Sequence, residues 1–406
     1  MGVQRHALIT GCGALSAFGA GVGAFWDGLL SGRSALAPIE SFDASGYTHP
    51  AAGEVKGFDP EDVLSAQAAK RLDRISQFAV AATYEALGDS RFDLDGADRT
   101  RVGVILGTTL GGMIVGEDYE RARHVGAEFP ARSLLHFPYY AVSGRLAREL
   151  GVRGPVIAPS IACASGTHAV GLALELIRSD QADVLIVGGA ETLCSFVVSG
   201  FDCLRAGARD TARPFDAARS GLLLGEGAAI LIIEEAGHAA ARGAAGSVAV
   251  CGSGLSGDAT HITAPARDGA GAARAMCAAL DDAGISPAAI DFISAHGTGT
   301  VYNDAMEAVA ITSVFGEAAP TIPVNSIKGA IGHTLGAAGA FEAIMSVRVI
   351  AEGIIPPTAN CEQLDPACTL DVVRGTARHK TVDTILSTSS AFAGNNAAIV
   401  LQRHRA

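Results

Sequence analysis

The sequence predicts an α/β fold, and three observations support this prediction. Short apolar runs that end at glycine alternate along the chain with longer helix-forming runs, which is typical of buried strands and the helices that cover them. The chain has 50 glycines, and 49% of its 406 residues are hydrophobic, so close packing around a large core is possible. A strand and glycine turn resembling the opening one begin again at residue 248, which favours two similar halves.

Each predicted strand is an apolar run that stops at a turn residue, and most predicted helices are longer, alanine-rich runs. The expected strands are residues 6–10, 101–106, 182–187, 227–234, 248–252, 290–294, 384–387 and 397–401. The expected helices are residues 164–178, 236–242, 268–283 and 330–351. We interpret residues 40–69 and 116–140 as excursions that cover the core or meet a partner, because they mix proline, glycine, charges and aromatic side chains. The pattern divides the chain into an N-terminal half, 1–247, and a C-terminal half, 248–406.

Composition narrows the possible functions. A net charge of −12 disfavours nucleic-acid binding. The strongest apolar runs, residues 184–187 and 228–233, are far shorter than the roughly 20 residues that a membrane helix needs. The N-terminus shows no secretory signal, and the eight cysteines show no metal-binding spacing. We therefore expect a cytoplasmic protein with free thiols, with no metal site and no membrane association.

Cys163 is the strongest candidate for a nucleophile. It lies among small residues, Ala162, Ala164, Ser165 and Gly166, which leave space around the sulfur for an acyl group. A predicted helix follows directly, so the thiol lies at a helix N-terminus, where free N–H groups and the helix dipole favour a thiolate. The N–H of Cys163 is also available to a developing oxyanion.

Two histidines in glycine-rich segments are candidate partners of this thiol. His296 follows a predicted strand directly and so lies at the carboxyl end of a sheet, where ligands bind. His333 lies in a second glycine-rich segment, five residues after Lys328, which could fix its geometry. Glu307 is a plausible ion-pair partner for Lys328, although a solvated Glu–Lys pair is the simpler alternative. One thiol and two such histidines indicate nucleophilic acyl transfer.

Two further segments allow both a functional and a structural interpretation. Phe392 lies on a turn of small residues between the two closing strands, and it is either a core aromatic or a mobile side chain beside the nucleophile. Gly11-x-Gly13 follows the first strand, but Ser16 stands where a dinucleotide-binding motif has its third glycine. A tight turn accounts for that segment.

The ordered motifs carry a resemblance that covers essentially the whole chain. They are Ile9-Thr10-Gly11-Cys12-Gly13, Leu106-Gly107-Thr108-Thr109-Leu110-Gly111-Gly112, Ala162-Cys163-Ala164-Ser165-Gly166, Val187-Gly188-Gly189-Ala190-Glu191, Arg213-Pro214-Phe215-Asp216, Leu224-Gly225-Glu226-Gly227-Ala228, the two histidine segments and the Gly394 turn. Together they resemble the β-ketoacyl-[acyl carrier protein] synthases of the elongating type II class, which are condensing enzymes of the thiolase-fold superfamily.

The resemblance implies a five-layer α/β/α/β/α fold built from two similar halves. It implies a catalytic site of Cys163, His296 and His333, supported by Lys328 and Glu307. Further positions match the family's gating phenylalanine and oxyanion hole (Phe392, with the N–H of Cys163), its phosphopantetheine contacts (Thr298 and Thr300) and its acyl pocket (Leu110).

The resemblance also implies the reaction and the partners. An acyl group on the cysteine condenses with malonyl-[acyl carrier protein], giving 3-oxoacyl-[acyl carrier protein] and CO2 in fatty acid or polyketide elongation. The substrates arrive on the phosphopantetheine arm of acyl carrier protein, and no other cofactor is implied. The enzyme would be a homodimer, or the ketosynthase subunit of a type II polyketide or polyene synthase paired with a chain-length factor.

Other members of the superfamily fit less well. A thiolase needs a second catalytic cysteine near the C-terminus, but no cysteine follows Cys368, and an initiating ketosynthase has asparagine in place of the second histidine. Retention of the candidate catalytic residues argues against an inactive partner subunit. Three segments depart from the family pattern: Ala391-Phe392-Ala393-Gly394, Val301-Tyr302 and the aromatic segment His136–Tyr140. They are compatible with a specialised polyketide or polyene pathway, and alanine in the gate predicts gate motion that is restricted or differently tuned.

Overall fold

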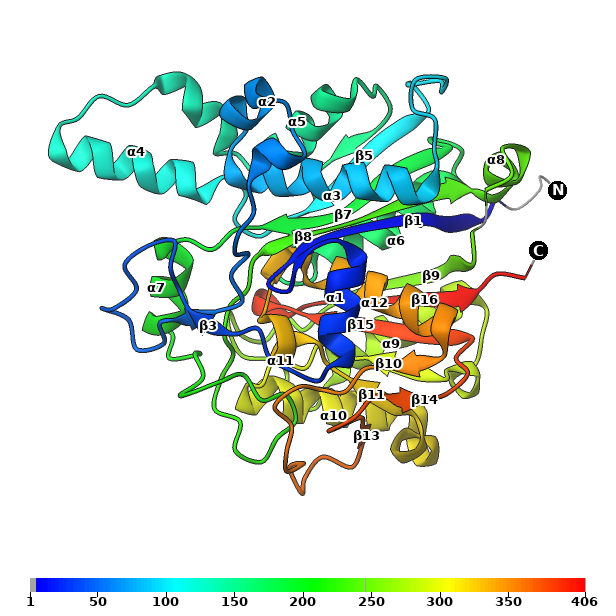
Figure 1. The fold of residues 1–406 in the computed structure, drawn as a ribbon. Coiled ribbons are helices and arrows are strands. Elements are labelled where there is room, and N and C mark those ends of the chain that lie inside the picture. The colour runs from blue at the N-terminus through cyan, green and yellow to red at the C-terminus, as the bar shows by residue number, and fades with distance from the viewer. Residues whose placement is uncertain (1–4, 245, 406) are drawn as a thin grey trace.

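The computed structural model describes residues 5–244 and 246–405 and contains one twelve-stranded mixed sheet. Its strands are ordered β13-β11-β10-β15-β16-β9-β1-β8-β7-β5-β6, with β2 paired to β1 (Figure 1). In chain order these strands are β1 (Ala7–Ser16), β2 (Gly19–Ala20), β5 (Val102–Gly107), β6 (Val156–Ile157), β7 (Val184–Glu191), β8 (Gly227–Glu235), β9 (Val248–Gly257), β10 (Phe292–Ser294), β11 (Pro323–Asn325), β13 (Asp371–Val372), β15 (Thr384–Ser390) and β16 (Asn395–Arg403). Two small pairs lie outside it, β3 (Ala37–Pro38) with β4 (Ala51–Ala52) and β12 (Ile354–Ile355) with β14 (Arg378–His379).

The two halves of the sheet form two separate layers. The helices form three further layers, one on each outer side and one between the two sheet layers (Figure 1). They are α1 (Val22–Leu30), α2 (Ala66–Arg71), α3 (Arg74–Ser90), α4 (Met113–Val125), α5 (Ala141–Leu150), α6 (Ser165–Arg178), α7 (Ser195–Cys203), α8 (Ala236–Ala241), α9 (Ala270–Ala283), α10 (Val301–Phe315), α11 (Lys328–Ile331) and α12 (Ala338–Glu352). Helices α3 and α5 pack on the first half of the sheet and α9 on the second, with α10 packed against α9. Helices α6 and α12 contact strands of both halves and lie between them (Figure 1). The predicted five-layer thiolase-like fold is confirmed.

The two halves repeat one strand order. The first half runs β6-β5-β7-β8-β1 and the second β11-β10-β15-β16-β9, with β13 added at the second half's outer edge. They join where β1 and β9 pair antiparallel over three residues of each strand, Ala7 to Ile9 against Val248 to Val250. The division at residues 247 and 248 stays a proposal, which the start of β9 at Val248 supports.

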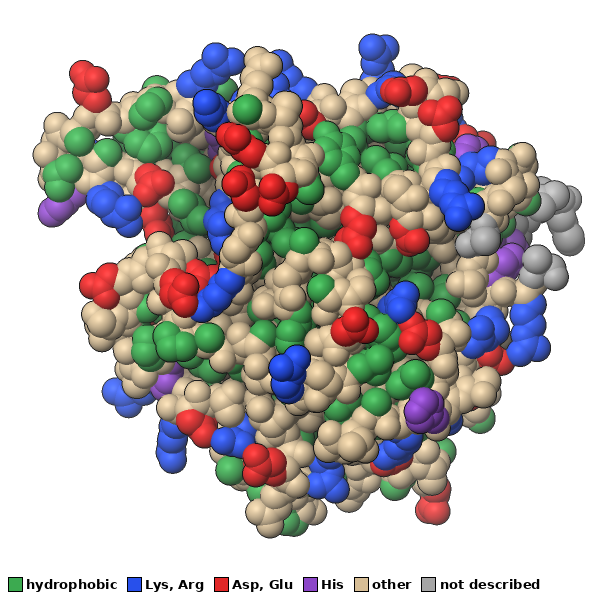
Figure 2. Space-filling model, in the orientation of Figure 1, with side chains coloured by type: hydrophobic (Ala, Val, Ile, Leu, Met, Phe, Trp, Pro, Cys, Tyr) green, Lys and Arg blue, Asp and Glu red, His purple; other side chains and the backbone are tan. Residues whose placement is uncertain are grey.

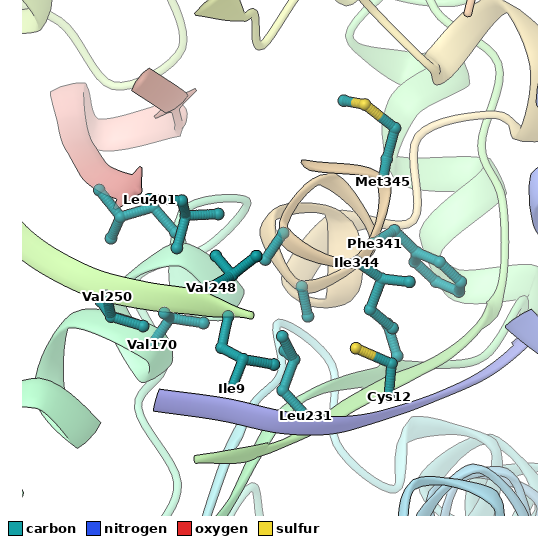
Figure 3. Packing of buried hydrophobic residues seen from close by; sticks show 14 of the residues in the cluster. Ile9, Cys12, Val170, Leu231, Val248, Val250, Phe341, Ile344, Met345 and Leu401 are labelled. Carbon is teal, nitrogen blue, oxygen red and sulfur yellow. The ribbon is translucent and has the colours of Figure 1, made fainter. Parts of the chain in front are cut away.

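The middle layer is the centre of the core. Figure 3 shows α12 side chains such as Phe341 and Ile344 close to β1 and β8 side chains such as Ile9 and Leu231. All four are 4% exposed or less, and burial of such a side chain contributes about 1.5–3 kcal/mol. Within α12, Glu342 is a charged residue that is fully buried, so it needs a partner.

The predicted strands are confirmed apart from shifts at their ends. The tight turn predicted at Gly11-x-Gly13 is wrong, because β1 continues through these residues to Ser16 and pairs with β8 there. One predicted helix is also wrong. The run 330–351 is not one helix, because α11 ends at Ile331 and α12 begins at Ala338. The break contains Gly332, whose φ of +76° suits glycine, and it is where His333 lies. The excursion 116–140 begins within the protruding helix α4, at the left of Figure 1, none of whose residues is buried.

Charged side chains of both signs alternate over the face shown in Figure 2. In the part of the chain that the structure describes, no helix is long and apolar enough to cross a membrane.

Candidate active site

Cys163 lies in the turn before α6, and the turn is held by Ser165. The Ser165 hydroxyl donates to the carbonyl of Ala162 at 2.6 Å and accepts from the N–H of Ile161 at 2.9 Å. Ala162 adopts a φ of +52°, which is costly for a residue with a Cβ. Backbone strain immediately before Cys163 is typical of a functional turn.

The resting state of this thiol differs from the sequence-based prediction. Cys163 is only 7% exposed, and burial raises the pKa of its thiol to about 12, although Lys328 acts to lower it. Glu191 and Glu342 raise the pKa of the thiol further. The prediction of a thiolate at the helix N-terminus is therefore wrong for the resting protein, because desolvation of the charged form outweighs the nearby cation.

His296 is fixed through the backbone of its turn. The two oxygens of Glu307, on α10, accept the N–H groups of His296 at 2.7 Å and Gly297 at 2.8 Å. The hydroxyl of Thr388 donates to the same carboxylate at 2.9 Å. Glu307 thus holds the backbone at His296 and leaves the ring free, with a buried Nδ1 that has no hydrogen-bond partner among the described residues.

His333 is fixed through both its backbone and its ring. Its backbone N–H donates to the carbonyl of Leu223 at 2.7 Å, and its ring Nδ1 accepts the backbone N–H of Leu335 at 3.2 Å. Because a backbone N–H can only donate, Nδ1 must be the unprotonated nitrogen in the neutral ring, and the proton lies on Nε2. His333 is therefore set up as an Nε2–H donor.

The two imidazoles converge and are neutral. Their ring centres lie 5.2 Å apart, with an angle of 81° between the ring planes. Burial lowers the pKa of each ring well below its usual range, and Lys328 lowers both further. Two neutral N–H donors facing one space can stabilise a negative oxygen as it develops.

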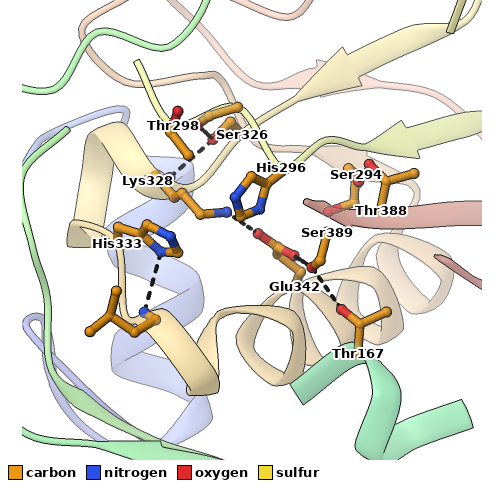
Figure 4. Close-up of polar contacts among 12 residues, drawn as sticks. Thr167, Ser294, His296, Thr298, Ser326, Lys328, His333, Glu342, Thr388 and Ser389 are labelled. Carbon is orange, nitrogen blue, oxygen red and sulfur yellow. Dashed lines mark hydrogen bonds and ion pairs between the residues drawn. The ribbon is translucent and has the colours of Figure 1, made fainter. Parts of the chain in front are cut away.

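Lys328 pairs with Glu342 and not with Glu307, so the predicted Glu307–Lys328 ion pair is wrong. The Nζ of Lys328 lies 2.5 Å from Oε1 of Glu342, and both side chains are 1% exposed. Figure 4 shows Lys328 directed toward Glu342, close to both imidazoles. Glu342 was missed because it lies 14 residues beyond Lys328, although an acidic side chain within the mostly apolar run 338–347 was a usable signal.

A cavity of about 440 Å³ joins most of the predicted residues. Its lining includes Cys163, His296, Thr298, Thr300, His333 and Phe392. Lys328 and Glu307 are each 1% exposed and are not part of this lining. Leu110 is not part of this lining and instead belongs to the apolar cluster that surrounds Cys163.

The threonines are held at the cavity by the start of α10. Thr300 caps this helix by accepting the N–H of Asn303 at 3.3 Å, and its hydroxyl lies 2.9 Å from that of Thr298. Asp304 accepts the N–H groups of Thr298 at 3.0 Å and Gly299 at 3.1 Å. Both hydroxyls thus sit on a rigid turn.

Phe392 stacks on Phe201, a contact that sequence reasoning missed, with ring centres 5.6 Å apart. The next residue, Ala393, has a φ of +64°, so this alanine adopts a left-handed conformation that glycine adopts at lower cost. The N–H of Ala393 donates to the carbonyl of Ile262 at 2.6 Å. The N–H groups of Cys163 and Phe392 make no hydrogen bond among the described residues, which leaves both available to an oxyanion.

Within the described ranges, no group of three or more His, Cys, Asp or Glu side chains could hold a metal ion.

Comparison with known proteins places this chain in a family. The family model "Beta-ketoacyl synthase, N-terminal domain" matches residues 4–239, and "Beta-ketoacyl synthase, C-terminal domain" matches residues 247–362. A 3-oxoacyl-[acyl-carrier-protein] synthase 2 of Synechocystis sp. is 38% identical over 413 residues, which cover 99% of each chain.

Two solved structures are also similar. The ishigamide ketosynthase/chain length factor has a TM-score of 0.93 and 38% identity, covering 99% of this chain and 100% of that chain. A ketosynthase structure described as a type II polyketide synthase acyl-carrier protein in complex with its ketosynthase bound to the hexaketide has a TM-score of 0.90 and 30% identity. That match covers 99% of this chain and 100% of the other.

Proposed function

This chain belongs to the β-ketoacyl synthase family, and on that premise we propose that it is an acyltransferase that elongates acyl chains by decarboxylative Claisen condensation. The observation that supports this most directly is the convergence of one buried thiol and two neutral imidazoles on one cavity. The thiol comes from the first half and the imidazoles from the second. The substrates are an acyl thioester and malonyl-[acyl carrier protein], and the products are 3-oxoacyl-[acyl carrier protein] and CO2.

Acylation comes first. The sulfur of Cys163 attacks the acyl thioester carbon, and the thiol proton moves to the departing phosphopantetheine sulfur, so the step releases no net proton. The positive charge of Lys328 lowers the pKa of the thiol, which offsets part of the desolvation that burial imposes. The N–H groups of Cys163 and Phe392 bind the oxyanion, while the acyl chain extends toward Leu110.

Condensation follows on the other side of the cavity. The hydroxyls of Thr298 and Thr300 hold the phosphopantetheine arm, and the imidazoles of His296 and His333 donate to the thioester oxygen of the malonyl group. The bond to the carboxylate breaks, CO2 leaves, and the electron pair forms an enolate whose charge these donors stabilise. The enolate carbon attacks the acyl group, and the Cys163 thiolate departs and takes up one proton.

The exposed excursion supports a second subunit as partner. Helix α4 has no buried residue, and Leu135, Phe137, Tyr139 and Tyr140 beside it are 43–70% exposed. Apolar and aromatic surface of this kind favours a protein interface. We infer a dimer in which this face meets either a second copy or a chain-length factor. The alternative function, ketosynthase subunit of a type II polyketide or polyene synthase, is favoured by the likeness to the ishigamide ketosynthase/chain length factor.

Acyl carrier protein would dock near the mouth of the cavity. Because acyl carrier proteins are acidic, we propose that basic residues guide the docking. Arg205 lines the cavity, and Lys70, Arg71 and Arg209 are exposed. Arg74 is less suited, because it pairs with the buried Glu226 at 2.6 Å. All eight cysteines are free thiols, which fits a cytoplasmic enzyme.

The proposal is tested by supplying acyl- and malonyl-[acyl carrier protein] to the purified chain. Mass spectrometry should find a 3-oxoacyl product two carbons longer than the primer, with one CO2 released per product. Size-exclusion chromatography with and without a candidate chain-length factor would separate the two assemblies. Release of acyl groups by hydrolysis alone, with no extended product from either assembly, would contradict the proposal.

A further inference from the structure

Glu191 is a buried carboxylate next to the site that the reaction above does not use. It is the last residue of β7 and is 0% exposed. Its Oε1 accepts the hydroxyl of Thr108 at 3.1 Å and the N–H of Leu110 at 3.0 Å. Its Oε2 accepts the N–H groups of Thr109 at 2.7 Å and Gly336 at 3.1 Å. Four donors thus satisfy this charge, and no cation within ion-pair distance of it is found in the described chain.

Residues 108–110, which donate to Glu191, form one wall of the proposed acyl pocket. Residues 108–110 follow β5 and bring Leu110 into the apolar cluster that contains Cys163. The hydroxyl of Thr108 also accepts the N–H of Gly111 at 3.0 Å. The backbone at Leu110 is therefore fixed by a carboxylate from the neighbouring strand.

The remaining bond reaches the turn of the second histidine. Gly336 follows Leu335, whose N–H donates to Nδ1 of His333. Leu335 has a φ of +47°, a left-handed conformation that a residue with a Cβ adopts only when its surroundings hold it. The bond from Gly336 to Glu191 anchors the peptide next to that strained residue, and so holds the N–H of Leu335 in the direction of the imidazole.

From these contacts we propose that Glu191 is a positioning residue that fixes His333 as an Nε2–H donor and at the same time holds Leu110 in the acyl pocket. The catalytic consequence of this inference rests on the proposed function. The positioning of His333 and Leu110 by Glu191 is independent of that function. The carboxylate ties the wall of the acyl site to the hydrogen-bond donor of the malonyl site.

The charge of Glu191 has a second consequence. Glu191 acts to raise the pKa of the Cys163 thiol, so its removal should make the thiol easier to ionise. If Glu191 had a purely structural role, its replacement would change stability without lowering the pKa of the Cys163 thiol.

The test compares Glu191→Gln with Thr108→Val. Glutamine keeps the shape of the side chain but has one accepting oxygen, so either the Thr108 and Leu110 donors or the Thr109 and Gly336 donors lose their acceptor. Thr108→Val removes one donor on the Leu110 side and leaves the Gly336 bond and the charge in place. Glu234→Gln is the control for loss of a buried carboxylate, since Glu234 is 0% exposed and bonded to Arg242 elsewhere in the fold.

Three measurements separate the roles. Nitrogen-15 spectra of histidine-labelled protein, with His333→Asn to assign the ring, should show one Nε2–H tautomer in the wild type and a mixture in Glu191→Gln. Alkylation of Cys163 by iodoacetamide should shift to lower pH in Glu191→Gln alone. In Glu191→Gln, decarboxylation of malonyl-[acyl carrier protein] should fall about tenfold to a hundredfold, as for groups that orient other functional side chains. Thr108→Val and Glu234→Gln should keep the wild-type tautomer of His333.

Either of two results would overturn the proposal. One is a wild-type His333 with its proton on Nδ1, which needs no variant to fold. The other is a folded Glu191→Gln with the wild-type tautomer and alkylation profile. If the wild-type protein does not decarboxylate malonyl-[acyl carrier protein] at all, the proposed function fails, whereas the tautomer and alkylation measurements still decide the role of Glu191.

Discussion

The first turns of α6 and α12 are alike and contact each other, but they adjoin different parts of the site. Each helix has glycine as its second residue, Gly166 and Gly339. A Cβ on Gly166 would lie 2.9 Å from the backbone of Ala340, and one on Gly339 would lie 2.0 Å from the hydroxyl of Thr167. The two helices therefore begin against each other. The turn before α6 presents Cys163, and the turn before α12 follows His333.

The surroundings of these two turns differ more than the turns themselves. Around Cys163 the first half supplies an apolar cluster, which suits an acyl chain. Around His333 the second half supplies the buried pair of Lys328 and Glu342, together with Glu307 behind His296. Two halves with the same strand order can thus divide one reaction. The first half surrounds the hydrocarbon chain, and the second stabilises the developing charge.

The largest expected effect is at the nucleophile. Cys163→Ala should abolish acylation by acyl-[acyl carrier protein], because no other thiol shares the cavity with the imidazoles. The same variant should still decarboxylate malonyl-[acyl carrier protein], since both imidazole donors remain. Intact-protein mass and CO2 release measure the two half reactions. Persistent acylation of this variant would show that the division between the halves is wrong.

The second largest effect is expected when one of the two imidazoles is removed. His333→Ala or His296→Ala should leave acylation of Cys163 measurable and lower decarboxylation about 10²–10³-fold, the usual cost of removing one oxyanion donor. His379→Ala, an exposed histidine on the short strand β14, is the control and should change neither. Equal losses in both half reactions would mean that the imidazoles also serve the first step.

The sequence predicted most of this division, and the exceptions have physical causes. Strands and the residues at their ends were predicted because apolar runs that stop at turn residues are local patterns, and His296 lies just beyond such a run. Cys163 was identified instead from its small neighbours and the helix that follows it. The partner of Lys328 was not predicted, since the break at Gly332 turns the chain and brings Glu342 back from a separate helix. The neutral state of Cys163 was not predicted either, because desolvation depends on packing around the whole site.

The buried ion pair gives the largest expected effect on stability. Lys328→Ala leaves Glu342 buried without its cation, and breaking such a pair costs about 3–5 kcal/mol of unfolding free energy. The thiol should also titrate at higher pH, because Lys328 acts to lower its pKa. Urea unfolding and the pH profile of alkylation measure the two effects. Lys56→Ala, which breaks an exposed pair with Glu40, should cost less than about 1 kcal/mol, and an equal loss in both variants would contradict this account.

The contact between the two helix starts is tested with one added methyl group. Gly339→Ala would place a Cβ against Thr167 and should destabilise the protein by about 1–3 kcal/mol. Gly88→Ala in α3, where a Cβ would meet nothing within 4 Å, should instead stabilise it by up to about 1 kcal/mol. Thermal unfolding compares them. Equal stability of the two variants would mean that the close approach of α6 and α12 is not required.

The smallest expected effect is at the turn of Phe392, where an alanine has the left-handed backbone that suits glycine. Ala393→Gly relieves a left-handed alanine, worth about 1–2 kcal/mol, but gives the unfolded chain more freedom, which costs about 0.4–1 kcal/mol. Stability should therefore change by less than about 1.5 kcal/mol, while Phe392 leaves Phe201 more readily and acylation by a long-chain substrate becomes about two- to tenfold faster. Ala391→Gly is the matched control, because Ala391 has an extended φ of −137° and no strain to relieve. If both variants accelerate acylation equally, loosening of the turn, and not relief at Ala393, controls the gate.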